Sequence, residues 1–291
     1  MDKPVITQEI IELYDEYTHA PLPRRVFLQR LAALVGSTAA AAAILPHLGP
    51  NYARAAIVPA DDARLETSHI TYPGPSGAVK AYLAKPRSGP AKMGGIVVIH
   101  ENRGVNPHIE DVARRAALEG FVALAPDLAS YMGGMPADAD QAREAFAKMD
   151  RAVAVRDGVA AVAYLKGRPD SNGKVGAMGF CWGGGAVIRI ATAAPDLNAA
   201  IVYYGDPPAA EEVSKIKAKM LMHYAALDQR IGAMVPGYET ALKAANVSYT
   251  AYTYEGANHA FNNDTSGDRY HEPSAKLAWT RTVAFMKENL S

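Results

Sequence analysis

The chain of 291 residues contains one cysteine, Cys181, and no excess of charge of either sign. A single cysteine excludes an intramolecular disulfide and any metal site built from several cysteines. Thirty Lys and Arg residues balance thirty Asp and Glu residues, so no overall field exists that would hold a polyanion or an acidic membrane surface. We therefore expect no nucleic-acid partner. A hydrophobic content of 49% is ample for the core of a globular protein.

Several motifs that bind cofactors are also missing. No phosphate loop of the form G-x-x-x-x-G-K-[ST] occurs, and no G-x-G-x-x-G fingerprint stands at a predicted strand end. The eight histidines include no His-Glu-x-x-His pair, and His100-Glu101 has no second ligand four residues on. The sequence thus predicts no metal and no cofactor, and a small-molecule substrate.

The first 56 residues read as a twin-arginine export signal. Arg24-Arg25 precedes an uncharged run at 31–45, and Ala53-Arg54-Ala55 is an A-x-A cleavage pattern before Ala56. The run of fifteen residues is too short to span a bilayer comfortably. This interpretation predicts an exported or periplasmic protein that has no integral membrane association after cleavage.

The alternative is that the same segment is a retained helical extension of a cytoplasmic protein. Its support is an amphipathic pattern ahead of the arginines, which is unusual for a signal. The apolar residues at helical spacing are Ile6, Ile10, Leu13, Tyr14 and Tyr17.

From residue 66 onward, short β-rich runs alternate with longer helical patterns. This alternation predicts an α/β fold, a mostly parallel sheet with helices on both faces, in one domain over 57–291. Strands are expected at 69–72 and 78–85, as an antiparallel edge, and then at 95–100, 121–126, 175–180, 200–204, 220–225 and 249–254. Helices are expected at 107–120, 137–166, 186–193 and 274–289.

The segment Gly179-Phe180-Cys181-Trp182-Gly183 lies between the strand at 175–180 and an apolar helix. Small residues two before and two after the cysteine are typical of a nucleophile elbow, whose sharp turn leaves no room for larger side chains. The helix that follows points its free amides at the sulfur, which favours negative charge there. Cys181 is therefore the predicted nucleophile.

Two further residues occur in the order that this fold requires. Asp228 follows the strand at 220–225, and His259 lies in a loop after the strand at 249–254. Loops at strand ends carry catalysis, and nucleophile, acid, base is the chain order of α/β-hydrolases. We expect Asp228 to orient His259, and His259 to act as the base for Cys181.

The segment after the strand at 95–100 is the expected second half of an oxyanion hole. Backbone amides of Trp182 and Asn102 form the natural pair to hold the oxygen of a tetrahedral intermediate. The side chain of Glu101 is placed to contact the thiol of Cys181 at rest.

These motifs make residues 66–291 resemble the dienelactone hydrolase, or carboxymethylenebutenolidase, family, in a branch with a twin-arginine-like N-terminal extension. The resemblance implies an α/β-hydrolase fold and a triad of Cys181, Asp228 and His259, with Glu101 in contact with the thiol. It also implies acyl transfer, in which the thiolate attacks a lactone or ester carbonyl and water then clears the acyl-enzyme.

The sequence departs from the family at the substrate-binding positions. The founding enzymes hold a substrate carboxylate with two arginines, and the one that follows the catalytic histidine by four positions is Asn263 here. The other aligns with Ala142 or Arg143, and Arg103 is either an anion contact or a salt-bridge partner in solvent. Tyr131 and Phe261 are further candidates for the pocket, alongside Arg103 and Arg143.

The resulting hypothesis is a hydrolase of small lactones, esters or related acyl compounds. The alternative is a non-catalytic or redox-sensing thiol protein on the same fold, because an exposed reactive thiol suits that role too. Only catalysis requires Asp228 and His259 together at their strand ends.

Overall fold

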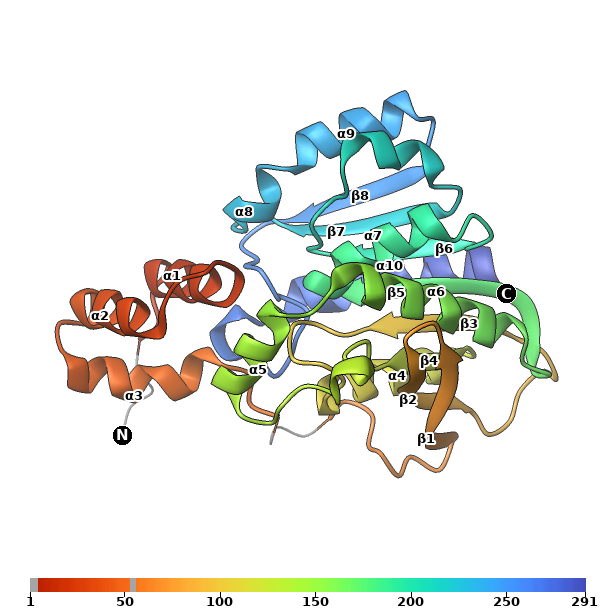
Figure 1. Cartoon of the computed structure of the whole chain (residues 1–291), viewed down its shortest axis with the longest axis horizontal. Coiled ribbons are helices and arrows are strands. Elements are labelled where there is room, and N and C mark those ends of the chain that lie inside the picture. Colours follow the sequence, from red (N-terminus) through yellow and green to blue (C-terminus); the bar gives the residue numbers. More distant parts are fainter. Residues whose placement is uncertain (1–4, 53–55) are drawn as a thin grey trace.

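The computed structural model describes residues 5–52 and 56–291, and its main body is built on a single eight-stranded sheet (Figure 1). The strands lie in the order β1-β2-β4-β3-β5-β6-β7-β8. β1 and β2 form an antiparallel hairpin at one edge, β2 pairs antiparallel with β4, and the other neighbours are parallel. The strands are β1 Leu65–Gly74, β2 Gly77–Pro86, β3 Met93–Ile99, β4 Val122–Pro126, β5 Ser171–Phe180, β6 Ala199–Tyr203, β7 Lys219–Ala225 and β8 Tyr249–Tyr254. The predicted α/β-hydrolase architecture, with its antiparallel edge, is confirmed.

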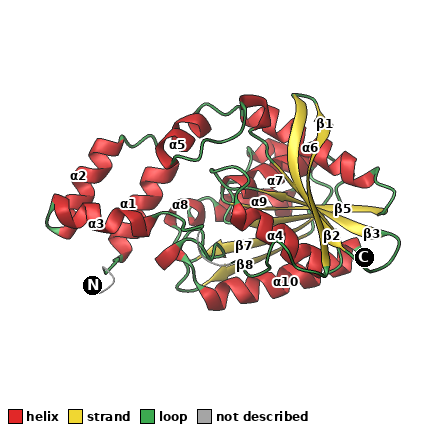
Figure 2. Ribbon diagram, turned by 90° about the horizontal axis from the view of Figure 1, so that it is seen from below, coloured by secondary structure: helices red, strands yellow, loops and turns green. Residues whose placement is uncertain are grey.

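Helices cover both faces of this sheet (Figure 2). Pro107–Leu118 (α4) and Glu272–Leu290 (α10) pack on one face, and Arg151–Lys166 (α6), Trp182–Ala193 (α7) and Val235–Ala244 (α9) pack on the other. Every residue of β3, β4 and β6 is buried, as expected for strands covered on both sides.

The helix expected at 137–166 is wrong as a single element. It is divided into Ala139–Ala147 (α5) and α6, because the Asp150 side chain accepts hydrogen bonds from the amides of Ala152 and Val153 and so starts a new helix. The sequence analysis also missed the short helix Gln229–Gly232 (α8) and the helix α9, which lie between β7 and β8. α8 matters for function because it begins directly after Asp228.

The N-terminal segment folds into three helices that form a lobe beside α5 (Figure 1). These are Gln8–His19 (α1), Arg24–Val35 (α2) and Thr38–Leu48 (α3). They bury a hydrophobic cluster of their own, to which α1 contributes the apolar stripe seen in the sequence: Ile10, Leu13, Tyr14, Tyr17, Phe27, Leu31, Ala41, Ile44 and Leu48. The amphipathic pattern therefore corresponds to a packed helix.

The apolar run at 31–45 is split between α2 and α3, which turn by 109° at Gly36 and Ser37. Within the described residues no single helix has the length and apolar character to cross a membrane, and only the bent pair α2 and α3 meets both conditions together. The cleavage pattern Ala53-Arg54-Ala55 lies outside the described residues.

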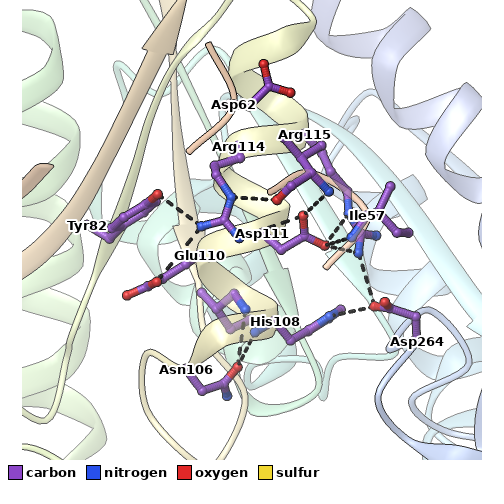
Figure 3. Close-up of polar contacts among 12 residues, drawn as sticks. Ile57, Asp62, Tyr82, Asn106, His108, Glu110, Asp111, Arg114, Arg115 and Asp264 are labelled. Atoms are coloured by element: carbon purple, nitrogen blue, oxygen red, sulfur yellow. Dashed lines mark hydrogen bonds and ion pairs between the residues drawn. The ribbon is translucent and has the colours of Figure 1, made fainter. Parts of the chain in front are cut away.

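A buried polar network ties the chain that follows this lobe to α4 (Figure 3). The backbone amide of Val58 donates to Asp111 Oδ1 at 2.8 Å, and Arg115 forms an ion pair with the same carboxylate. Arg115 also reaches Asp264 at 3.1 Å, and His108 Nδ1 lies 2.9 Å from that aspartate. The network joins three distant parts of the sequence at the start of α4.

Asp111→Ala is expected to lower the free energy of unfolding by about 3 kcal/mol, because it leaves the amides of Ile57 and Val58 without their acceptor and removes one of the two carboxylates that pair with Arg115. Guanidinium chloride unfolding measures the change. The matched control is Glu272→Gln, which breaks an exposed i,i+4 pair with Lys276 and should leave the midpoint unchanged. Equal effects from the two variants would contradict the role given to Asp111.

Asp264 should make the fold sensitive to acid. Burial favours the neutral carboxyl, but the hydrogen bond with His108 and the charge of Arg115 outweigh it and hold the pKa at about 2, below the ordinary 3.8. The ionised form thus stabilises the folded state above pH 3.8, and this contribution is lost as the pH falls towards 2. Between pH 3.8 and pH 2, the midpoint temperature of thermal unfolding should fall less steeply for Asp264→Asn than for the unmodified chain. Parallel curves would contradict this assignment.

Candidate active site

Cys181 stands at the turn between β5 and α7 in a strained backbone conformation. Its φ is 57° and its ψ is −121°, a combination that few side chains adopt. A Cβ on Gly179 would lie 2.2 Å from the carbonyl oxygen of Gly183, and a Cβ on Gly183 would lie 2.3 Å from that of His100. No larger residue would therefore fit at either glycine position. The turn is a nucleophile elbow that presents the sulfur at the N-terminus of α7.

Asp228 and His259 meet beside the elbow. His259 Nδ1 lies 2.5 Å from Asp228 Oδ2, and both side chains are buried. Burial favours the neutral acid, but the charge and hydrogen bond of His259 lower the pKa of Asp228 below its ordinary value. The Asp228 carboxylate thus orients the imidazole, and the buried His259 Nε2 has no hydrogen-bond partner among the described residues.

The hydrogen-bond partner of the sulfur is a residue that the sequence analysis did not single out. His19, the last residue of α1, places Nε2 3.1 Å from Cys181 Sγ. Its Nδ1 lies 3.1 Å from the carboxylate of Asp15, one turn earlier in α1. The Asp-x-x-x-His spacing was visible in the sequence, but no sequence signal placed α1 against the elbow.

His19, Cys181 and His259 together form a compact set of potential metal ligands. The ligand-type atoms of His19, Cys181 and His259 all lie within 4.8 Å of one another. Two imidazole nitrogens and a thiolate are donors that Zn²⁺ accepts. These atoms are, however, the ones that acyl transfer would use.

A cavity of about 820 Å³ opens in front of the thiol. Its apolar wall is made by Leu22, Phe146, Trp182, Ile231 and Met234, and its polar groups include Asn102, Arg143, Arg151 and Asp206. Trp182 is held between Phe146, whose ring centroid is 5.4 Å away, and His100, at 5.7 Å. The cavity is therefore shaped partly by the main domain and partly by the N-terminal segment.

The predicted oxyanion-hole residues lie on this cavity together with Cys181. Trp182 is the first residue of α7, where a helix leaves its amides free, and Asn102 also lines the cavity. The side chain of Asn102 reaches the carbonyl oxygen of Thr18 at 3.5 Å, so it also touches the N-terminal segment.

Glu101 is buried near the thiol, and its carboxylate accepts a hydrogen bond of 2.7 Å from Asn263 Nδ2. Glu101, Cys181 and His259 line a common cavity of about 30 Å³. Direct contact between Glu101 and the thiol stays a prediction, because the hydrogen bond of the sulfur goes to His19. Asn263, which replaces the family arginine, thus positions Glu101.

Both predicted arginines contact the N-terminal segment. Arg143 donates to the carbonyl oxygens of Tyr17 at 3.0 Å and Leu22 at 2.7 Å, and it lines the large cavity. Arg103 donates to the Tyr14 hydroxyl at 3.4 Å and lies outside that cavity. A carboxylate-binding role for either arginine stays a prediction. Arg151, which the sequence analysis missed, also lines the cavity and pairs with Asp206 at 2.7 Å.

Two candidate pocket residues lie elsewhere. Phe261 is fully buried and packs against Tyr204 and Tyr254, so its ring fills the core behind the site. The Tyr131 hydroxyl accepts a hydrogen bond from the Asp150 amide at 2.6 Å, which fixes the start of α6. Neither residue lines the large cavity, and the expectation that they line the pocket beside the thiol is corrected accordingly.

Comparisons with known proteins identify the family of this chain. A family model described as "Dienelactone hydrolase family" matches residues 79–290, and a second, described as "YqhI-like", matches residues 3–36. A Saccharolobus solfataricus protein named "Putative carboxymethylenebutenolidase" is 30% identical over 256 residues, which cover 75% of this chain and 97% of the relative. An Escherichia coli K12 protein named "Putative hydrolase fragment YghX" is 47% identical over 112 residues, 38% of this chain and 96% of the relative.

A solved structure gives the same result for the fold. The crystal structure of a "Putative Dienelactone Hydrolase" from Klebsiella pneumoniae is 28% identical, covers 77% of this chain and 99% of its own, and superposes with a TM-score of 0.71. The match of the family model spans nearly all of the sheet and includes Cys181, Asp228 and His259. This chain belongs to the dienelactone hydrolase family and is a hydrolase of the kind that acts on lactones and esters.

Proposed function

We propose that the protein hydrolyses small lactones, esters or related acyl compounds through a triad of Cys181, His259 and Asp228 and an acyl-enzyme on the cysteine. The observation that carries the proposal is the elbow. It holds the thiol at a helix N-terminus, beside the Asp228–His259 pair and on the wall of a cavity of about 820 Å³.

The reaction follows from these positions. The thiolate attacks the carbonyl carbon, and the backbone amides of Trp182 and Asn102 are placed to stabilise the oxyanion. The proton that the Cys181 thiol gave to a neighbouring histidine passes to the departing alkoxide, which leaves as the alcohol, and a thioester remains on Cys181. His259 then takes a proton from the attacking water, and the acid is released as the thiolate re-forms. The cavity of about 30 Å³ lined by Cys181 and His259 has room for one water molecule.

The cavity lining favours a compact acyl compound with an apolar body. Five of its lining residues are large and apolar, and Arg143 and Arg151 line it as well. Both arginines already have partners, Arg143 in backbone carbonyls and Arg151 in Asp206. This supports neutral lactones and esters ahead of substrates that depend on two free arginines.

Trapping the acyl-enzyme tests the proposal. The full chain is mixed with p-nitrophenyl acetate, quenched in acid within one turnover and analysed by intact mass and peptide mapping. One acetyl group on the peptide that contains Cys181 is expected. Turnover of the ester with no acetylated Cys181 under conditions that trap slow intermediates would contradict covalent catalysis by this thiol.

The export signal is a proposal of a different kind, and it also has a direct test. The twin-arginine motif Arg24-Arg25 supports export, and the contacts of α1 with Cys181 and Arg230 support the alternative of a retained extension. Mass spectrometry of the protein from its native host distinguishes the two. A mature N-terminus at Ala56 supports export with cleavage, whereas an intact N-terminal segment supports retention.

A further inference from the structure

The thiol of Cys181 has a histidine on each of two sides. His19, from α1, is hydrogen-bonded to Sγ at 3.1 Å, and His259 belongs to the triad. The two rings meet edge to face, with centroids 4.7 Å apart and planes at 72°. The His19 side chain is 13% exposed and touches both Cys181 and His259, so the end of α1 forms part of the site.

Each histidine is supported by its own aspartate. Asp228 holds His259, and Asp15 lies 3.1 Å from His19 Nδ1. Arg230 links the two pairs, with Nε 3.4 Å from Asp15 Oδ2 and Nη2 3.4 Å from His259 Nδ1. Asp15 and His19 thus form a second Asp–His pair next to the sulfur, similar to that of Asp228 and His259.

The surroundings favour charge on this second pair. Burial favours a neutral Asp15, but the charge of His259, the hydrogen bond of His19 and the charge of Arg230 hold its pKa well below the ordinary value. Burial alone would lower the pKa of His19, but the charge of Cys181 and the hydrogen bonds of Asp15 and Cys181 raise it. These contacts therefore favour the protonated form of His19 beside the sulfur.

Only one of the two histidines reaches the large cavity. His19 and Cys181 both line the cavity of about 820 Å³, and His259 is not among the residues of its wall. His259 lines two smaller cavities, of about 250 Å³ and about 30 Å³, and His19 lines both of these as well. A substrate bound in the large cavity would thus place its leaving group beside His19.

We propose that α1 supplies a second catalytic histidine, His19, which takes the proton of the Cys181 thiol and later gives it to the leaving alcohol, while His259 activates water. The proposal rests on the proposed acyl-enzyme function and divides its proton transfers between two bases. The thiol proton moves to His19 Nε2, the thiolate displaces the alkoxide, and the alkoxide takes the proton from His19. Water then gives a proton to His259, adds to the thioester, and the departing thiolate recovers that proton.

The experiment compares three variants of the full chain. His19→Ala removes the proposed base, and His19→Gln keeps a hydrogen-bonding side chain there if alanine loosens the lobe. His47→Ala is the matched control, because His47 is an exposed histidine on α3 of the same lobe. The readouts are the pre-steady-state acetylation of Cys181 by p-nitrophenyl acetate and the rate of Cys181 alkylation by iodoacetamide as a function of pH.

For both His19 variants we expect acetylation near pH 7 to slow by roughly 10²-fold and alkylation to require higher pH, because the thiolate has lost its partner. His47→Ala should behave like the unmodified chain. Unchanged acetylation and alkylation in the His19 variants would overturn the role of His19, and faster reactions would show that α1 blocks the site instead. Absence of acetylation in the unmodified chain would instead count against the proposed function itself.

Discussion

Cys181→Ala is expected to lower kcat/KM for p-nitrophenyl acetate by roughly 10⁴-fold or more, because loss of a nucleophile removes the covalent route and leaves only binding and the oxyanion hole. The residue lies on the cavity wall and is mostly buried, so a change from thiol to methyl removes one atom from a site that is otherwise intact. Initial rates of p-nitrophenolate release measure the effect.

The control for Cys181→Ala is a check that the variant still folds. Cys181 is the only cysteine of the chain and forms no disulfide, so its loss should leave the thermal unfolding midpoint and circular dichroism nearly unchanged. Equal turnover by Cys181→Ala and the unmodified chain would exclude the thiol as nucleophile. That result would leave the family fold standing and would favour a binding or sensing role for the cysteine.

The second large effect is expected from His259→Ala. Asp228 holds its imidazole beside the small cavity that the thiol also lines, and removal of a positioned general base costs roughly 10²-fold or more in kcat. Because the loss falls on the attack of water, the acetylated enzyme should accumulate. Steady-state rates and the intact mass during turnover together measure this.

His69→Ala is the matched control for His259→Ala, since His69 lies on β1 with its side chain 76% exposed and far in sequence from the triad. Its activity should equal that of the unmodified chain. If His259→Ala hydrolyses the ester at an unchanged rate, another group activates the water and the triad assignment is wrong. If it turns over slowly without accumulating acetyl-enzyme, His259 acts before the acyl-enzyme forms.

The elbow could be predicted from the sequence because its requirements are local. Gly179 and Gly183 flank Cys181 within five residues, and the structure shows backbone oxygens where either side chain would begin. Asp228 and His259 were found for a related reason. They follow the neighbouring strands β7 and β8, and parallel strands deliver their ends to one edge of the sheet, where such residues meet.

Where local pattern was ambiguous, the prediction was less accurate. The helix at 137–166 has no glycine or proline at its break, and only the capping of α6 by Asp150 shows that two helices are present. Phe261 follows the catalytic histidine by two residues in the sequence, yet its ring turns into the core, because the loop reverses direction at Ala260, whose φ is 66°. Proximity in sequence to a catalytic residue did not determine which side chains line the cavity.

The sequence thus predicted the fold class, the elbow at Cys181 and the meeting of Asp228 with His259, all of which depend on strand periodicity and on turns within a few residues. The part of the active site that α1 contributes could not be predicted from the sequence, because it depends on tertiary packing. His19 lies 162 residues before Cys181, and the contact between them arises because the lobe of α1, α2 and α3 docks at the strand ends. No local pattern encodes such a docking, because the apolar stripe of α1 sets which face is buried and says nothing about where the polar end of the helix will point.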